Sequence, residues 1–178
     1  KYGRAWASLQ SEFGTALDKY TIKVDRPVTD AELLTVHSAQ YLASLRDAKE
    51  LASALELAPI ALLPATLTRW RVLRPMRWGA RGSVLAAQAA LETGLAANLS
   101  GGYHHAKPTE GEGFCIYSDI ALLVAQLRAE NKLAATDRIA YIDLDAHQGN
   151  GVCHHFLNDP SVTIFDMFNG EIYPCSDE

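Results

Sequence analysis

Acidic and imidazole side chains alternate in the run YIDLDAHQGNG, which begins at Tyr141 and closes an apolar segment. If the chain stays extended there, a side-chain period of two sends Asp143, Asp145 and His147 to one side. Carboxylates at the end of an apolar strand are costly unless they meet a cation or hydrogen-bond donors. Because Asp and His are ordinary zinc ligands, the spacing predicts a site for Zn²⁺ or a similar divalent metal. The alternative interpretation is a capped strand end, with Asp145 hydrogen-bonded to the next helix.

A pair of adjacent histidines, His104 and His105, follows two glycines in the run GGYHHA. Two neighbouring imidazoles can supply a base and an acid near neutral pH, so this pair is the second candidate for chemistry. The chain holds another pair, His154 and His155, in the run CHHFLND. That pair lies on an expected helix without a glycine turn before it, so we interpret both residues as surface residues.

Two further segments suggest ligands less clearly. The run TEGEGFC, residues 109–115, lacks the glycine spacing and the lysine of a phosphate-binding loop. We expect its glycines to let the backbone pass close to a ligand and to present Phe114 to it. Between residues 69 and 78, arginines are interleaved with tryptophans, a pattern that can indicate stacking on nucleic acid. We favour a solvated or salt-bridged surface beside packed tryptophans, because the chain is negatively charged.

The first half of the chain is predicted to be helical. A capping box at residues 29–32 begins a helix expected over residues 30–46. His37 lies beside the apolar stripe of that helix, so we interpret it as a structural residue. Three prolines predict an irregular segment over residues 58–77, and residues 83–97 form a helix on composition.

The second half alternates between strand and helix patterns. We expect a short strand before Gly101, a helix from Asp119, and strands over residues 138–145 and 161–168. Such an order requires crossovers and therefore a parallel sheet. The sequence predicts an α/β fold, a parallel sheet with helices on both faces, and function where the strands end.

Composition narrows the possible functions. The chain has 178 residues, with 16 Lys and Arg against 21 Asp and Glu, for a net charge of −5. No basic run suggests direct nucleic-acid binding, and no window is long and apolar enough for a membrane span. The 48% apolar content and the length predict a single domain over residues 1–178. The three widely spaced cysteines indicate reduced thiols, and with no signal peptide after Lys1 we expect a nuclear or cytoplasmic protein.

Taken in order, the motifs resemble those of zinc-dependent histone deacetylases, most closely the class IV branch. The resemblance covers most of the chain and rests on five runs: VHSAQYLASL, RWRVLRPMRWGARGSVLAAQ, GGYHHAKPTEGEGFCIYSDIAL, RIAYIDLDAHQGNGV and FNGEIYP. It implies an arginase/deacetylase fold and a zinc hydrolase that removes acetyl or longer acyl groups from lysine side chains. Histones or other acyl-lysine proteins would be substrates, and corepressors or other proteins are possible partners.

The resemblance also implies roles for particular residues. Asp145 and His147 match zinc ligands, and His104 and His105 match the paired catalytic histidines. Asp143 matches the residue that orients His104. A K⁺ ion near the carbonyl of Asp143 is a further implication of the family.

Asn150 stands where many members carry an aspartate, and it matches the class IV pattern. A neutral amide can fix the ring of His105 without stabilising its charged form. Gly113, Phe114 and Tyr173 match positions that line the acyl-lysine channel. Cys175 departs from a glycine that is usual after the preceding proline.

By the same resemblance, a third zinc ligand and an oxyanion-stabilising tyrosine belong to regions beyond these 178 residues. We therefore expect a partial catalytic domain with weak or no activity alone. One alternative is a catalytically inactive scaffold that keeps the fold and binds partners. Another is a ureohydrolase of the arginase type, which would need an acid where this chain has Gly149.

Overall fold

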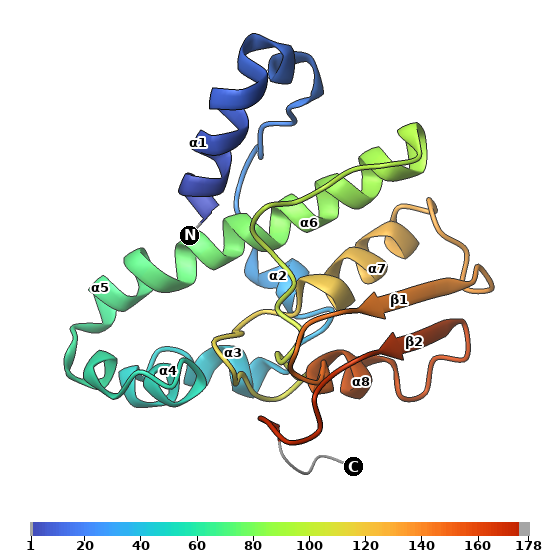
Figure 1. Ribbon diagram of the computed structural model, residues 1–178. Coiled ribbons are helices and arrows are strands. Elements are labelled where there is room, and N and C mark those ends of the chain that lie inside the picture. The colour runs from blue at the N-terminus through green and yellow to red at the C-terminus, as the bar shows by residue number, and fades with distance from the viewer. Residues whose placement is uncertain (1, 175–178) are drawn as a thin grey trace.

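The structure is a computed structural model that describes residues 2–174, and Figure 1 shows its helices around two strands. Its helices in the first half are α1 (Tyr2–Phe13), η1 (Gly14–Tyr20), α2 (Asp30–Leu33), α3 (Ala39–Ser44), α4 (Ala48–Ala54), η2 (Ala58–Leu62), α5 (Ala65–Thr68), η3 (Arg69–Leu73) and α6 (Arg74–Thr93). Then follow α7 (Asp119–Ala129), β1 (Ile139–Asp143), α8 (Asn150–Phe156) and β2 (Val162–Asp166). Cys175 lies outside the described residues.

The two strands form a parallel sheet flanked by helices, as the alternating second half of the sequence predicts. Their register pairs Asp143 with Asp166, so both strands end on an aspartate at the same edge of the sheet. The face that α7 and α8 cover carries the alternate apolar residues Ile139, Tyr141, Val162 and Ile164. On the opposite face Ile142 is 62% exposed and Phe165 is 60% exposed.

The larger apolar core joins the first half of the chain to α6 and α7. Its most deeply buried members include Leu33, Leu51, Val84, Ile116 and Leu122. The helix from Asp119 begins where expected, because the Ser118 hydroxyl accepts a hydrogen bond from the Ala121 amide. This core fixes the segment between α6 and α7, which carries the histidine pair.

The helix predicted over residues 30–46 is two short helices, α2 and α3. The capping box is present, since Thr29 and Glu32 exchange side-chain and backbone hydrogen bonds. The break follows from competing partners: Ser38 caps α3, and its amide donates to the carbonyl of Pro108 at 2.9 Å. His37 turns inward at this break, where it is 4% exposed and accepts from the Ser118 amide at 3.0 Å. Its structural interpretation is confirmed.

The segment predicted to be irregular, residues 58–77, is largely helical. Pro59 and Pro75 lie in the first turns of η2 and α6, where a missing amide donor costs little. Pro64 stands at the N-cap of α5. The wider π-helical turn of η3 leads directly into α6, which begins earlier than predicted and ends at Gly94 with φ +86°.

The strand predicted before Gly101 is wrong, because residues 95–100 form no strand. The Asn98 amide group instead donates to the Gly79 carbonyl, the Ser83 hydroxyl and the Ser100 carbonyl. These side-chain bonds replace a strand ladder and fasten the segment to α6. Cys115 and Cys153 are unpaired thiols. Among residues 2–174, no helix has the length and apolarity that a membrane crossing would need.

Candidate active site

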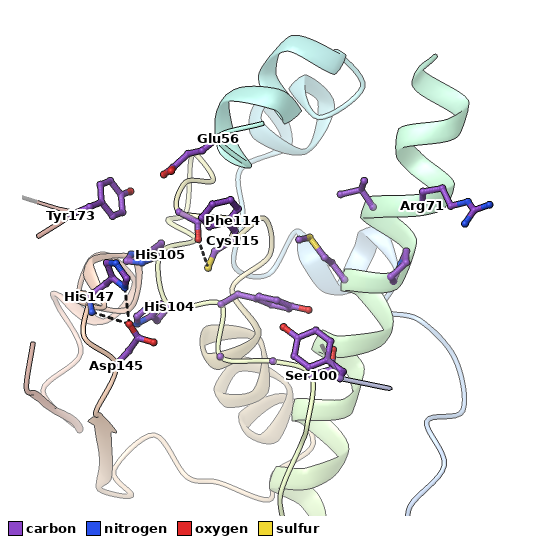
Figure 2. A pocket seen from close by; sticks show the side chains of 18 residues that line it. Glu56, Arg71, Ser100, His104, His105, Phe114, Cys115, Asp145, His147 and Tyr173 are labelled. Carbon is purple, nitrogen blue, oxygen red and sulfur yellow. Dashed lines mark hydrogen bonds and ion pairs between the residues drawn. The ribbon is translucent and has the colours of Figure 1, made fainter. Parts of the chain in front are cut away.

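A cavity of about 730 Å³ lies where the second-half loops meet α6. Figure 2 shows His104, His105, Asp145, His147 and Tyr173 toward one end, and Arg71 and Ser100 toward the other. The cavity is thus lined by His104, His105, Asp145 and His147, four of the candidate site residues from the sequence. Asp143 and Asn150 support the two adjacent histidines from behind.

His104 has a carboxylate partner. Its Nδ1 lies 2.8 Å from Asp143 Oδ2, and both side chains are buried. Burial alone would raise the pKa of Asp143, but hydrogen bonds from the Tyr141 hydroxyl, the Asp145 amide and His104 outweigh it and lower that pKa. Asp143 is therefore an ionised acceptor beside His104, in the orienting position that the resemblance implies.

His105 has an amide partner. Its Nδ1 lies 2.8 Å from Oδ1 of Asn150, which is 2% exposed at the start of α8. Burial lowers the pKa of His105, although the bond to Asn150 opposes the shift. The two imidazole rings lie with centroids 4.0 Å apart, so two bases with different partners share one end of the cavity.

Glycines let the chain approach these rings closely. A Cβ added at Gly113, where φ is +53°, would lie 2.3 Å from His105 Cδ2. A Cβ at Gly151 would lie 2.4 Å from the His105 carbonyl carbon. The Val152 amide of α8 then donates to the His104 carbonyl at 3.1 Å. Glycine is needed at both positions because no side chain fits there.

Asp145 and His147 lie beside each other at the cavity wall, with His147 Nδ1 2.9 Å from Asp145 Oδ1. The prediction that Asp143 shares their side assumed extended backbone, but β1 ends at Asp143 and that side chain turns to His104. Asp145 does not cap the next helix either, because the N-cap of α8 is Gly149 without a side-chain bond. The bond from Asp145 to the next helix that the alternative expects is therefore absent from the described residues, although Asp145 accepts from the His147 amide at 2.8 Å just after the strand.

The donor types of this pair suit zinc, since a carboxylate and an imidazole lie in contact with each other at the cavity wall. The hydrogen bonds from the His147 amide and ring lower the pKa of Asp145, so it is an anionic donor. Within residues 2–174, no three His, Cys, Asp or Glu side chains come together as a metal site. The described residues thus fit zinc in donor type and offer two candidate ligands, where catalytic sites use three protein ligands.

The predicted channel residues lie over the histidines. Phe114 is 54% exposed and adopts φ +65°, a strained left-handed conformation, while its amide donates to the Ala54 carbonyl. The ring of Tyr173 lies with its centroid 5.2 Å from that of His105. These two residues and Gly113 all line the cavity.

Sequence reasoning missed several residues at this site. Glu112 hydrogen-bonds the Asn150 amide group, and the Tyr141 hydroxyl supports Asp143. Glu112 and Asn150 lie 38 positions apart and meet only in the folded chain, so no local pattern marks their bond. Tyr141 and Asp143, by contrast, are two positions apart in the run that the sequence analysis singled out, and their contact was overlooked. His155 was also misread: His154 is exposed, but His155 is half-buried and its Nε2 bonds the Ala106 carbonyl.

The histone deacetylase domain matches the chain over residues 1–178. The chain belongs to the histone deacetylase domain family. This deacetylase domain is 40% identical over 176 residues to histone deacetylase 2 of Arabidopsis thaliana, covering 98% of this chain and 44% of that protein. It is 31% identical over 146 residues to the acetoin utilization protein AcuC of Staphylococcus aureus, covering 80% and 36%.

Solved structures agree with the fold of this deacetylase domain. A crystal structure of an HDAC homolog complexed with SAHA matches 96% of this chain and 47% of that chain, with a TM-score of 0.69 and 26% identity. An HDAC homolog from Aquifex aeolicus matches 91% and 44%, with a TM-score of 0.65 and 27% identity. These neighbours have the arginase/deacetylase fold expected from the resemblance. The chain spans less than half the length of each of these relatives.

Proposed function

We propose that the protein hydrolyses acyl groups, acetyl or longer, from lysine side chains of histones or other proteins, with Zn²⁺ as its metal. One observation carries the proposal: two adjacent histidines with different partners face a carboxylate–imidazole pair across one cavity. This set of groups suits hydrolysis of an amide, which needs a base for water and an acid for the leaving amine. The amide partner of His105 supports membership of the class IV branch.

The two histidines have different roles in this proposal. A carboxylate partner stabilises an imidazolium, whereas an amide partner leaves the ring neutral. His105, beside Asn150, takes the proton from the attacking water. His104, beside ionised Asp143, gives a proton to the departing lysine amine. Phe114 and Tyr173 hold the alkyl part of the acyl-lysine and exclude water around it.

Asp145 and His147 would hold the zinc ion, with a third ligand from a further part of the protein. When bound, zinc polarises the acyl carbonyl and makes its coordinated water more acidic. We also propose a K⁺ ion near the carbonyl of Asp143. The supporting observation is Asp166 Oδ1, which is buried and has no hydrogen-bond partner among residues 2–174.

We further propose that residues 1–178 are one partial catalytic domain. Acyl-lysine peptides or proteins are its substrates, corepressors or other proteins are candidate partners, and direct nucleic-acid binding plays no part. The negative net charge of the chain supports the last point. A nuclear or cytoplasmic location fits its unpaired cysteines.

The deciding experiment measures metal content and acyl-lysine peptide hydrolysis for this chain and for the complete gene product. We expect stoichiometric zinc and turnover in the complete product, and weak or no turnover in the chain alone. Neither zinc nor turnover in the complete product would contradict the proposal. That result would favour the alternative of an inactive scaffold that retains the fold for partner binding.

A further inference from the structure

A line of polar side chains continues behind His105, away from the cavity. Asn150 accepts from His105 Nδ1 through its Oδ1 and donates from its Nδ2 to Glu112 Oε1. Glu112 in turn lies 3.1 Å from the Lys107 ammonium, which also bonds Glu110 at 3.0 Å. The Glu112 side chain is 26% exposed and that of Lys107 is 11% exposed, so this line is largely screened from water.

The side-chain amide of Asn150 can face His105 in two ways, and each selects a different imidazole. With Oδ1 toward the ring, His105 Nδ1 carries the proton and Nε2 keeps a free lone pair. With Nδ2 toward the ring, the amide donates to Nδ1 and the proton moves to Nε2. Because each neutral tautomer has only one ring acceptor, only the first leaves Nε2 able to take a proton. An aspartate at position 150 would have no second orientation to exclude, since both oxygens of a carboxylate only accept hydrogen bonds.

We propose that Glu112 is a positioning residue that fixes the orientation of the Asn150 amide and thereby the reactive tautomer of His105. The proposal deepens the function proposed above and rests on it for the role of His105 as base. A carboxylate can only accept, so Glu112 admits only Nδ2 on its side and leaves Oδ1 for the histidine. Glu112 touches neither the ring nor the cavity wall, and it acts through Asn150.

One other group favours the same orientation. The backbone amide of Gly151, the next residue in the chain, donates to Asn150 Oδ1 at 3.0 Å. A hydrogen bond to an ionised acceptor is about twice as strong as one between neutral groups. The Lys107 ammonium pairs with the Glu112 carboxylate at 3.1 Å. Of the Glu112 and Gly151 bonds to the Asn150 side chain, the one to Glu112 is the stronger.

The test is the tautomer of His105 in this chain, read from imidazole nitrogen shifts in a nitrogen-15 spectrum at about pH 8, where imidazoles are neutral. The variant Glu112→Gln keeps the shape but can face Asn150 with either its oxygen or its amino group. We expect the single Nδ1–H form of the wild type to become a mixture of both tautomers. The matched control is Glu110→Gln, which removes a carboxylate from the same lysine and should leave a single Nδ1–H form.

A second substitution keeps the inference open to contradiction. Adding Asn150→Asp to Glu112→Gln restores a partner that only accepts, so the double variant should return to the Nδ1–H form alone. A single Nδ1–H form in Glu112→Gln would overturn the proposal, because the Asn150 amide would then keep its orientation without the carboxylate. A mixture that persists in the double variant would overturn it too, since the cause would lie elsewhere than the amide.

These spectra need neither zinc nor substrate, so they separate this inference from the proposed function. If the complete product hydrolyses acyl-lysine, Glu112→Gln should lower kcat about tenfold with KM unchanged. Unchanged kcat alongside mixed tautomers would contradict the link to catalysis. An inactive complete product with the tautomer changes described would contradict the proposed function and leave the positioning role of Glu112 standing.

Discussion

His104 and His105 are adjacent in sequence and in space, yet the fold gives them partners of different chemistry. The partner of His104 is a carboxylate with a lowered pKa, and the partner of His105 is a buried amide. The difference bears on the basicity of the two imidazoles, because only the carboxylate stabilises a charged ring. Two residues of the cavity, His105 and His147, are each the subject of a prediction.

The first concerns His105. Asn150→Asp, made together with Glu112→Gln so that two carboxylates do not face each other, should raise the pKa of His105. Because the base is active only when unprotonated, the acid limb of the pH profile of kcat/KM should move to higher pH in the complete product. Zinc affinity should change less than this limb does. A shift in metal affinity alone would remove Asn150 from its proposed place behind the base.

The second concerns the proposed metal ligands. His147→Ala in the complete gene product should abolish zinc retention and turnover together, as measured by elemental analysis and peptide hydrolysis. His154→Ala is the matched control, since His154 is exposed on α8 and lies outside the cavity. Unchanged zinc content in His147→Ala would exclude His147 from the site.

Much of the candidate site could be predicted from the sequence because its residues form two short runs. His104 and His105 follow a glycine pair, and Asp145 and His147 follow a strand. The contact between Glu112 and Asn150 behind His105 could not be predicted in this way. Glu112 and Asn150 are separated by 38 positions and meet only in the folded chain, so no local spacing predicts their bond.

Among the elements, one junction joins several helices through the buried imidazole of His37 and the half-buried imidazole of His155. His37, between α2 and α3, accepts from the Ser118 amide at the start of α7. His155 of α8 bonds the Ala106 carbonyl and contacts the ring of His37 at 5.7 Å between centroids. Burial lowers the pKa of each to about 4. Both rings are therefore neutral in the folded protein at neutral pH.

This junction predicts acid sensitivity. The unfolded chain protonates His37 near pH 6.5 and the folded chain only at about 4, so the unfolded state binds more protons between these values. Stability should fall as pH drops from about 6.5 to 4, by on the order of 3 kcal/mol for a fully buried ring. His37→Gln should flatten this part of the Tm–pH curve, whereas the exposed His154→Gln should not. An unchanged slope in His37→Gln would show that other groups set the acid limit.

The sequence predicts well the elements that depend on neighbouring residues. The helix from Asp119 and the strands of the second half follow from a capping serine and from β-branched runs, which are local signals. The break between α2 and α3 depends on Pro108 and Ser118, which are distant in sequence. Residues 58–77 are largely helical because Pro59 and Pro75 fall in the first turns of helices, and composition alone does not reveal those positions.

For the whole molecule, the sheet is covered unequally. α7 and α8 bury one face, while Ile142 and Phe165 stand on the other at 62% and 60% exposure. Leu144 and Met167, just beyond the strand ends, are 68% and 62% exposed. A contiguous apolar surface of this kind favours self-association of the isolated chain.

We therefore predict that Ile142→Thr with Phe165→Thr raises the monomer fraction of the isolated chain, measured by sedimentation, and lowers binding of a hydrophobic dye. Threonine keeps the strand propensity, so Tm should change little. Ile164→Thr is the comparison on the covered face, where the same substitution should lower Tm by removing packing against α8. Equal association of the wild type and the double variant would show that this face does not drive it.

The helix α1 contributes Tyr2 to the lining of the cavity, yet no residue of α1 or η1 is buried. Figure 1 shows α1 standing away from the body of the molecule, joined to α2 by an extended segment. An element with so little buried surface opens at a low free-energy cost, independently of the core. Amide protons of α1 should accordingly exchange with solvent far faster than those of α6, and each opening of α1 would take Tyr2 out of the cavity lining while the histidines stay in place.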